Sequence, residues 1–298
     1  MTDYAKSLEK LKTSALGAAM TRAFAAQEPD AGIRNGDSLA REFLDPAARP
    51  PKNDPDKIAA FREQLEGALP GAYHFQNART KHIDTRLEKA LADGFRQVVM
   101  LGAGFDTRAY RFGESAPDVR FFEVDLPELQ AEKKAKITDI FGSLPTNVVY
   151  MPLDFNKEPL SRLLDAPGFD RSRPTFFNWE GVSYYLTAEG VEATLAFVAN
   201  QCAADSKILF DYMPSAMVEG TGAYYGGAES RDYMAKFGEP LLFGIEDDAI
   251  DDFLQARGFR LESCFGPDDL ENAYLITGEG ERYGRVSGYV RIAEARVL

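Results

Sequence analysis

The chain has 298 residues, of which 45% are hydrophobic, and its formal net charge is −13. This length and composition are typical of a globular protein with a well-buried core, in one large domain or two small ones. The negative charge would repel nucleic acid phosphates and anionic membranes, and the chain has neither a signal-peptide pattern nor an apolar run of about 18 residues. We therefore expect a cytoplasmic protein with no nucleic acid or membrane partner.

Residues 1–93 are predicted to form a helical cap. Ala, Lys, Glu and Leu recur at helical spacing in 3–27 and in 54–69, and the proline-rich stretch 47–56 predicts an exposed connection between the two helices. A third helix is expected from Asn77 to Ala92, because its apolar residues share one face. No stretch of this cap has the pattern of a strand.

Residues 94–298 are predicted to form an α/β domain, because short apolar runs alternate there with helix-like segments. Strands are predicted at 97–103, 119–125, 147–154, 174–180, 207–213, 259–265 and 273–279. The segment 214–245 is rich in glycine and tyrosine and too long for a simple connection, so it is predicted to be an inserted lid. The fold class is thus α/β, a Rossmann-like sheet of seven strands with an N-terminal helical extension and a lid.

The motif VVMLGAGFDTRAY at 98–110 is the most informative stretch of the sequence. An apolar strand leads directly to Gly102 and Gly104, which allow a tight turn and a close approach of a ligand to the main chain. Asp125 ends the next predicted strand, where an acid can accept hydrogen bonds from ribose hydroxyls. Glu123 shares a face of that strand with Asp125, so either acid could hold a ribose.

A dinucleotide enzyme has a similar turn, so NAD is an alternative ligand. Its motif requires a third glycine at position 107, which is Thr107 here, and both Phe105 and Asp106 are bulky for a loop around a pyrophosphate. A nucleoside ligand without phosphates fits this turn better. No cysteine or histidine spacing predicts a metal site.

Acidic and aromatic residues also follow the third and fourth predicted strands. Asp154 and Phe155 would flank an adenine, and the stretch 176–187 places Glu180 and a tyrosine pair at the same edge of the sheet. An acid beside aromatic rings suits a sulfonium cofactor, by charge and by cation–π attraction.

The blocks ARTKHID, LGAGFDTR, FFEVDLP, PLDF and NWEGVSYYL, in this order and spacing, resemble the leucine carboxyl methyltransferase family over residues 75–213. The resemblance implies a seven-stranded fold that binds S-adenosylmethionine (SAM). It further implies Arg79 on the carboxylate of the cofactor, Gly102 under its methionine part, Asp125 on its ribose, Asp154 and Phe155 at its adenine, and Glu180 near its methionine amine.

Methyl transfer from a sulfonium needs chiefly that the acceptor oxygen be aligned with the methyl carbon, and orientation can supply about 7–11 kcal/mol. A carboxylate is already ionised at pH 7, whereas a phenol or alcohol benefits from a general base. The only histidines, His74 and His82, lie in the helical cap. We therefore predict no catalytic residue and favour a carboxylate acceptor, with a hydroxyl as the alternative.

The cap and the lid are predicted to close over the cofactor, with Tyr184, Tyr224 and Tyr225 lining the acceptor pocket. Arg22 or Lys81 would supply a positive charge to the acceptor. The leading function is methylation of a small molecule, a natural product or metabolite. The alternatives are methylation of a protein C-terminal carboxylate and a noncatalytic nucleotide-binding module.

Overall fold

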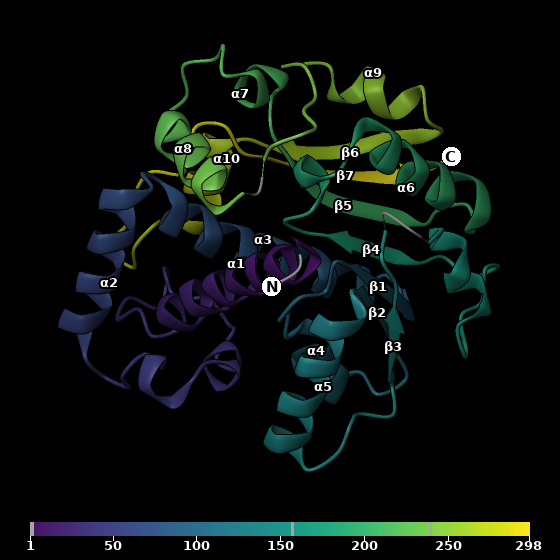
Figure 1. Ribbon diagram of the computed structural model, residues 1–298, viewed down its shortest axis with the longest axis horizontal. Helices are drawn as coiled ribbons and strands as arrows, with labels where there is room; N and C mark the ends of the chain where they lie inside the picture. The colour runs from purple at the N-terminus through teal and green to yellow at the C-terminus, as the bar shows by residue number, and fades with distance from the viewer. Residues whose placement is uncertain (1–2, 156–157, 239) are drawn as a thin grey trace.

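The computed structural model describes residues 3–155, 158–238 and 240–298, and one mixed sheet organises them (Figure 1). The strand order is β3-β2-β1-β4-β5-β7-β6. The strands are β1 Gln97–Leu101, β2 Arg120–Asp125, β3 Val148–Pro152, β4 Phe176–Trp179, β5 Lys207–Tyr212, β6 Phe259–Phe265 and β7 Arg291–Val297. The pairs among β1 to β5 are parallel, and β7 is antiparallel to both β5 and β6. This confirms the predicted α/β fold, with six of the seven strands where the sequence places them.

The seventh predicted strand, 273–279, is wrong. Helix α10 (Pro267–Tyr274) occupies its beginning, and only an isolated bridge forms at Ile276. The actual strand, β7, was hidden by its charged residues, of which Glu294 is only 1% exposed. A carboxylate can be buried in this strand because Lys207 on β5 lies 3.0 Å from it.

Three helices dominate residues 3–93, and this part of the chain contains no strand. They are α1 Asp3–Ala25, α2 Pro55–Ala68 and α3 Ala72–Ala92, with 3₁₀ turns η1 Ala40–Phe43 and η2 Pro46–Ala48 between the first two. The α3 helix begins five residues earlier than predicted, because the Glu66 carboxylate accepts hydrogen bonds from the backbone N–H groups of Gly71 and Tyr73 at 2.7 and 2.8 Å. These bonds satisfy donors that a helix start leaves unpaired.

Helices cover both faces of the sheet. In β1, Val98 and Met100 pack toward one face, and Val99 and Leu101 pack toward the other. The first face is covered by α1, α3, α4 (Arg108–Ser115), α5 (Pro127–Phe141) and α10, and the second by η3 (Leu160–Asp165), α6 (Ala188–Gln201) and α9 (Ile250–Gln255). No helix in the described parts of the chain is both long enough and apolar enough to span a bilayer.

The segment 214–245 leaves the sheet after β5 and returns to the same point. The Ser215 N–H donates to the Ile245 carbonyl at 3.0 Å, and the Ile245 N–H donates to the Met213 carbonyl at 3.0 Å. Between these ends the segment contains α7 (Ser215–Glu219) and α8 (Gly227–Phe237). The insertion is therefore closed at its base, and α8 lies beside the carboxyl ends of the strands.

Candidate functional site

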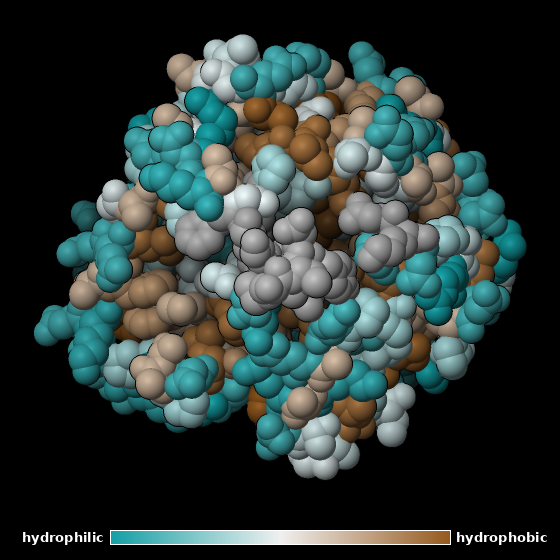
Figure 2. Space-filling view, viewed as in Figure 1, coloured by the Kyte–Doolittle hydropathy of each residue, from teal (hydrophilic) through white to brown (hydrophobic). Residues whose placement is uncertain are grey.

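A cavity of about 500 Å³ lies at the carboxyl ends of β1, β2 and β4, between this edge of the sheet and helices α1, α3 and α8. Figure 2 shows a patch of hydrophobic side chains above the middle of this face of the molecule. The volume lies in the range of about 300–1,000 Å³ that is typical of small-molecule pockets. Ligands of open α/β sheets bind at this edge.

The glycine turn after β1 lines the cavity with its backbone. Gly102 and Gly104 have φ angles of +72° and +40°, which favour glycine. A Cβ atom on Gly102 would lie less than 3.0 Å from Cγ2 of Val182. The turn therefore requires glycine at position 102 both for its backbone conformation and for space.

Asp125, at the end of β2, is held against this turn. Its carboxylate accepts hydrogen bonds from the N–H of Gly104 and, at 2.7 Å, from the N–H of Leu126. Burial raises the pKa of Asp125 above its ordinary value. Glu123, the other acid that the sequence offered, does not line the cavity, because it is buried against Lys133 at 2.8 Å and Tyr110 at 3.2 Å. Of the two acids, only Asp125 therefore lies where its carboxylate can contact a ligand in the cavity.

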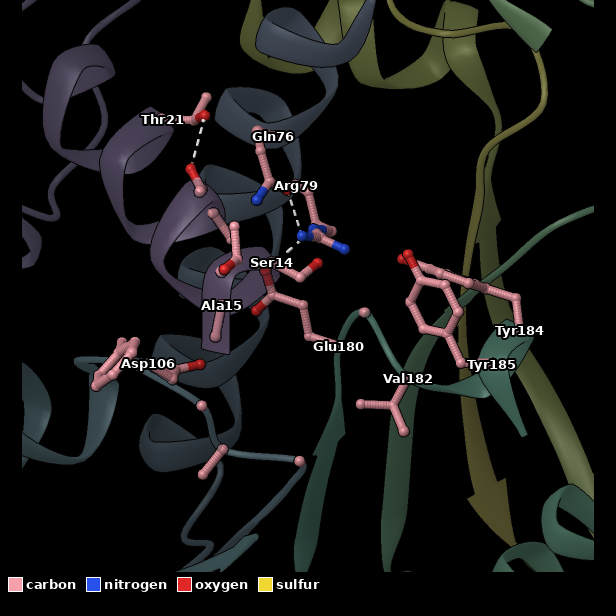
Figure 3. Close-up of a pocket in the computed structure, with 18 of the residues that line it drawn as sticks. Ser14, Ala15, Thr21, Gln76, Arg79, Asp106, Glu180, Val182, Tyr184 and Tyr185 are labelled. Atoms are coloured by element: carbon pink, nitrogen blue, oxygen red, sulfur yellow. Dashed lines mark hydrogen bonds and ion pairs between the residues drawn. The ribbon is translucent and has the colours of Figure 1, made fainter. Parts of the chain in front are cut away.

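Arg79 and Glu180 meet at the centre of the cavity (Figure 3). Arg79 Nε lies 3.0 Å from Glu180 Oε1, and Arg79 Nη1 donates to Asp211 on β5. The second oxygen of Glu180 accepts from Arg108 Nη1 at 2.6 Å. Although burial opposes ionisation, Arg108 and Arg79 hold the pKa of Glu180 below its ordinary value. Glu180 is therefore a carboxylate at neutral pH.

Arg22 lines the cavity, but its charge is already matched. Its Nε lies 2.8 Å from Asp37 Oδ2, and its Nη2 donates to the Phe105 carbonyl at 2.7 Å. It thus ties α1 to the glycine turn. Lys81, the other cation considered from the sequence, is absent from the lining and donates to the Tyr274 carbonyl at 2.8 Å.

The remaining predicted residues divide between the cavity and the surface around it. Asp154 and Phe155 line the cavity, as do Tyr184 and Tyr185, whose ring centroids are 4.6 Å apart. In Figure 3 this tyrosine pair lies across the opening from Arg79.

Tyr224 and Tyr225 do not line the cavity, so their expected place in an acceptor pocket is corrected. The Tyr224 hydroxyl donates to Asp247 at 2.8 Å, and the Tyr225 ring lies 4.1 Å from the Arg285 guanidinium carbon. Both precede α8, and it is that helix that reaches the cavity. Its lining side chains are Ser230, Tyr233 and Met234.

Neither histidine lines the cavity. Burial lowers the pKa of both His74 and His82 to about 4, so both are neutral at pH 7. Within the described ranges, no cluster of three or more His, Cys, Asp or Glu side chains could hold a metal ion.

Sequence reasoning missed three lining or supporting residues. Gln76 accepts a hydrogen bond from Arg79 and lines the cavity, and its place one helical turn before Arg79 is a signal that could have found it. Asn178 was visible as a polar residue inside an apolar strand. Asp211 had no such signal, because its partner, Arg79, is far away in the sequence.

Two solved structures share this fold. A DUF574 family protein from Streptomyces avermitilis superimposes with a TM-score of 0.61 at 16% identity, covering 87% of this chain and 97% of its own. A Thermobifida fusca protein that is named as a methyltransferase gives a TM-score of 0.58 at 16% identity, covering 91% of this chain and 96% of its own. Both structures therefore share the overall fold of this chain.

The leucine carboxyl methyltransferase family model matches residues 15–199, and the chain belongs to this family. Bacillus subtilis YktD, named as a SAM-dependent methyltransferase, is 30% identical over 75% of this chain and 72% of its own length. A Streptomyces coelicolor relative with the same kind of name is 33% identical over 73% of this chain and 75% of its own. The predicted family and cofactor, SAM, are confirmed.

Proposed function

We propose that this enzyme transfers the methyl group of SAM to a carboxylate oxygen of a small molecule, a natural product or metabolite. The observation that carries the proposal is the pairing of the acids at the centre of the cavity. Glu180 is paired with two arginines, and Arg108, opposed by burial, lowers the pKa of Asp106 to about 2. Such acids are weak bases, and a carboxylate is the oxygen acceptor that needs none.

The lining residues fit the parts of SAM. Gly102 lines the cavity beside the proposed place of the methionine part, and Asp125 offers carboxylate oxygens to ribose hydroxyls. Asp154 and Phe155 are proposed to flank the adenine. The ionised Glu180 would attract the ammonium group, and Arg79 the carboxylate. SAM supplies the activated methyl group, and these residues hold it in place for the acceptor.

The part of the cavity away from the glycine turn suits an acceptor with an apolar body. Its wall comes from helices α2, α3 and α8 and from the segment before β7, and it carries no charged side chain. The lining residues there are Leu65, Leu69, Ala72, Phe75, Gln76, Ser230, Tyr233, Met234 and Tyr289. An acceptor bound against this wall would be stabilised mainly by the burial of apolar surface, by about 25 cal/mol for each Å².

The test is methylation with SAM labelled in its methyl group, offered with a panel of apolar carboxylic acids and of phenols of matched size. Mild alkali releases labelled methanol from a methyl ester but not from a methyl ether. Alkali-labile product from the acids supports the proposal. Alkali-stable product from the phenols, or label that accumulates only in added protein, would contradict it.

A further inference from the structure

Asn178 is a polar residue placed in the middle of the sheet. It lies on β4, where its register partners are Met100 on β1 and Leu209 on β5. The residue is 4% exposed and lines the cavity. The oxygen of its side-chain amide is buried and has no hydrogen-bond partner.

An unpaired amide oxygen in such a place costs about 1–3 kcal/mol. The apolar side chains of Met100 and Leu209 cannot donate to it. The two guanidinium groups that line the cavity have other partners, since Arg79 binds Glu180 and Asp211, and Arg22 binds Asp37. A ligand that enters with an N–H group would remove this cost.

Asn178 lies on β4 and Glu180 directly follows this strand, and the side chain between them, Trp179, packs on the opposite face of the sheet. Residues at this spacing share a face and lie about 6.6 Å apart along a strand. A tetrahedral ammonium group that donates to two acceptors at about 2.9 Å holds them about 4.7 Å apart. Side chains that converge from positions about 6.6 Å apart on one face can meet this separation.

We infer that Asn178 binds the ammonium group of the methionine part of the cofactor, together with Glu180. Glu180 supplies the negative charge, and Asn178 supplies a neutral second acceptor. A neutral acceptor adds a hydrogen bond without adding another charge to a site that already holds several carboxylates. The inference rests on the proposed cofactor site.

Isothermal titration with two ligands tests it. S-adenosylhomocysteine contains the ammonium group, whereas 5′-methylthioadenosine keeps the adenosine and the sulfur but lacks the amino acid. We expect Asn178→Leu to weaken binding of S-adenosylhomocysteine by 10-fold or more, about 1.4 kcal/mol. Binding of 5′-methylthioadenosine should stay within about twofold. Asn178→Asp, which keeps an acceptor oxygen, should restore most of the affinity for S-adenosylhomocysteine.

The matched control is Asn200→Leu, on the exposed side of α6, which should leave both affinities unchanged. If Asn178→Leu does not unfold cooperatively, Asn178→Ala repeats the test without added bulk. Equal losses for the two ligands, or no loss for S-adenosylhomocysteine, would overturn the role of Asn178 while leaving the cofactor site intact. Wild-type protein that binds neither ligand would instead contradict the proposed cofactor site itself.

Discussion

The contact between Gly102 and Val182 offers a quantitative test of how the cofactor turn is built. Gly102 has a φ of +72°, and a Cβ atom there would lie less than 3.0 Å from Val182 Cγ2. Gly102→Ala therefore has two separable costs, the left-handed backbone and the overlap with a side chain. Only the second depends on Val182, so a second substitution can isolate it.

The backbone cost is about 1–2 kcal/mol for a residue with a Cβ. Carbon atoms pack at about 3.5–4.0 Å, so Val182 must shift, and overpacking of this kind costs about 1–3 kcal/mol. Gly102→Ala should thus destabilise the fold by about 2–5 kcal/mol. Val182→Ala alone removes half-buried methyl groups at a cost of about 1 kcal/mol. In the double variant the overlap is absent, so its two substitutions should couple favourably by about 1–3 kcal/mol.

The assay is urea unfolding of the wild type, both single variants and the double variant. Gly142→Ala is the matched control, because its φ is +78° and nothing lies within 4 Å of a Cβ placed there. It should show the backbone cost alone. Additive effects of Gly102→Ala and Val182→Ala, with coupling below about 0.5 kcal/mol, would refute the argument that Val182 encloses the turn.

Three further predictions concern buried ionisable groups. Asp125→Ala should weaken S-adenosylhomocysteine binding by 10-fold or more in titration calorimetry, and unchanged affinity would remove its ribose role. Lys133→Met should lower the free energy of unfolding in urea by about 3–5 kcal/mol, because Glu123 loses its buried partner. Adding Glu123→Gln should recover part of this loss. A loss that persists in the double variant would mean that Lys133 stabilises the fold by packing and not by its charge. Because burial lowers the pKa of His74 and His82 from 6.5 to about 4, protons bind the unfolded chain first, and stability should fall as pH drops from about 6.5 to about 4. His74→Leu should reduce this loss of stability, measured by urea unfolding at a series of pH values. An unchanged dependence of the free energy of unfolding on pH would contradict the role of His74.

The gathering of the proposed cofactor residues at one cavity was predictable because its signals are local. Gly102, Asp125, Asp154 and Glu180 each follow a short apolar run, and parallel strands bring their carboxyl ends to one edge. The sequence alone left Glu123 and Asp125 equivalent. What separates them is the buried Lys133, which packs from α5, and no spacing within β2 could reveal that partner.

Charge pairing was not predictable, because its partners are distant in the chain. Arg22 was expected to receive an acceptor, yet Asp37 and the Phe105 carbonyl satisfy it. Strand β7 was not predicted for the same reason, because its Glu294 can be buried in the sheet only beside Lys207. In a sequence pattern, a charged residue predicts a solvent-exposed position. Only the folded chain shows that a residue of opposite charge is buried beside it.

The family match covers the proposed cofactor residues but only part of the proposed acceptor wall. The match covers residues 15–199, which include the glycine turn, Asp125 and Glu180, whereas α8 and Tyr289, which complete the acceptor wall, lie beyond it. Tyr289 and Ser230 hold each other by a hydrogen bond of 2.6 Å between their hydroxyls, so α8 and the C-terminal segment form one surface. The proposed cofactor residues thus lie in the part shared with relatives, and we expect differences in acceptor among them to trace chiefly to the part of the wall that lies beyond the match.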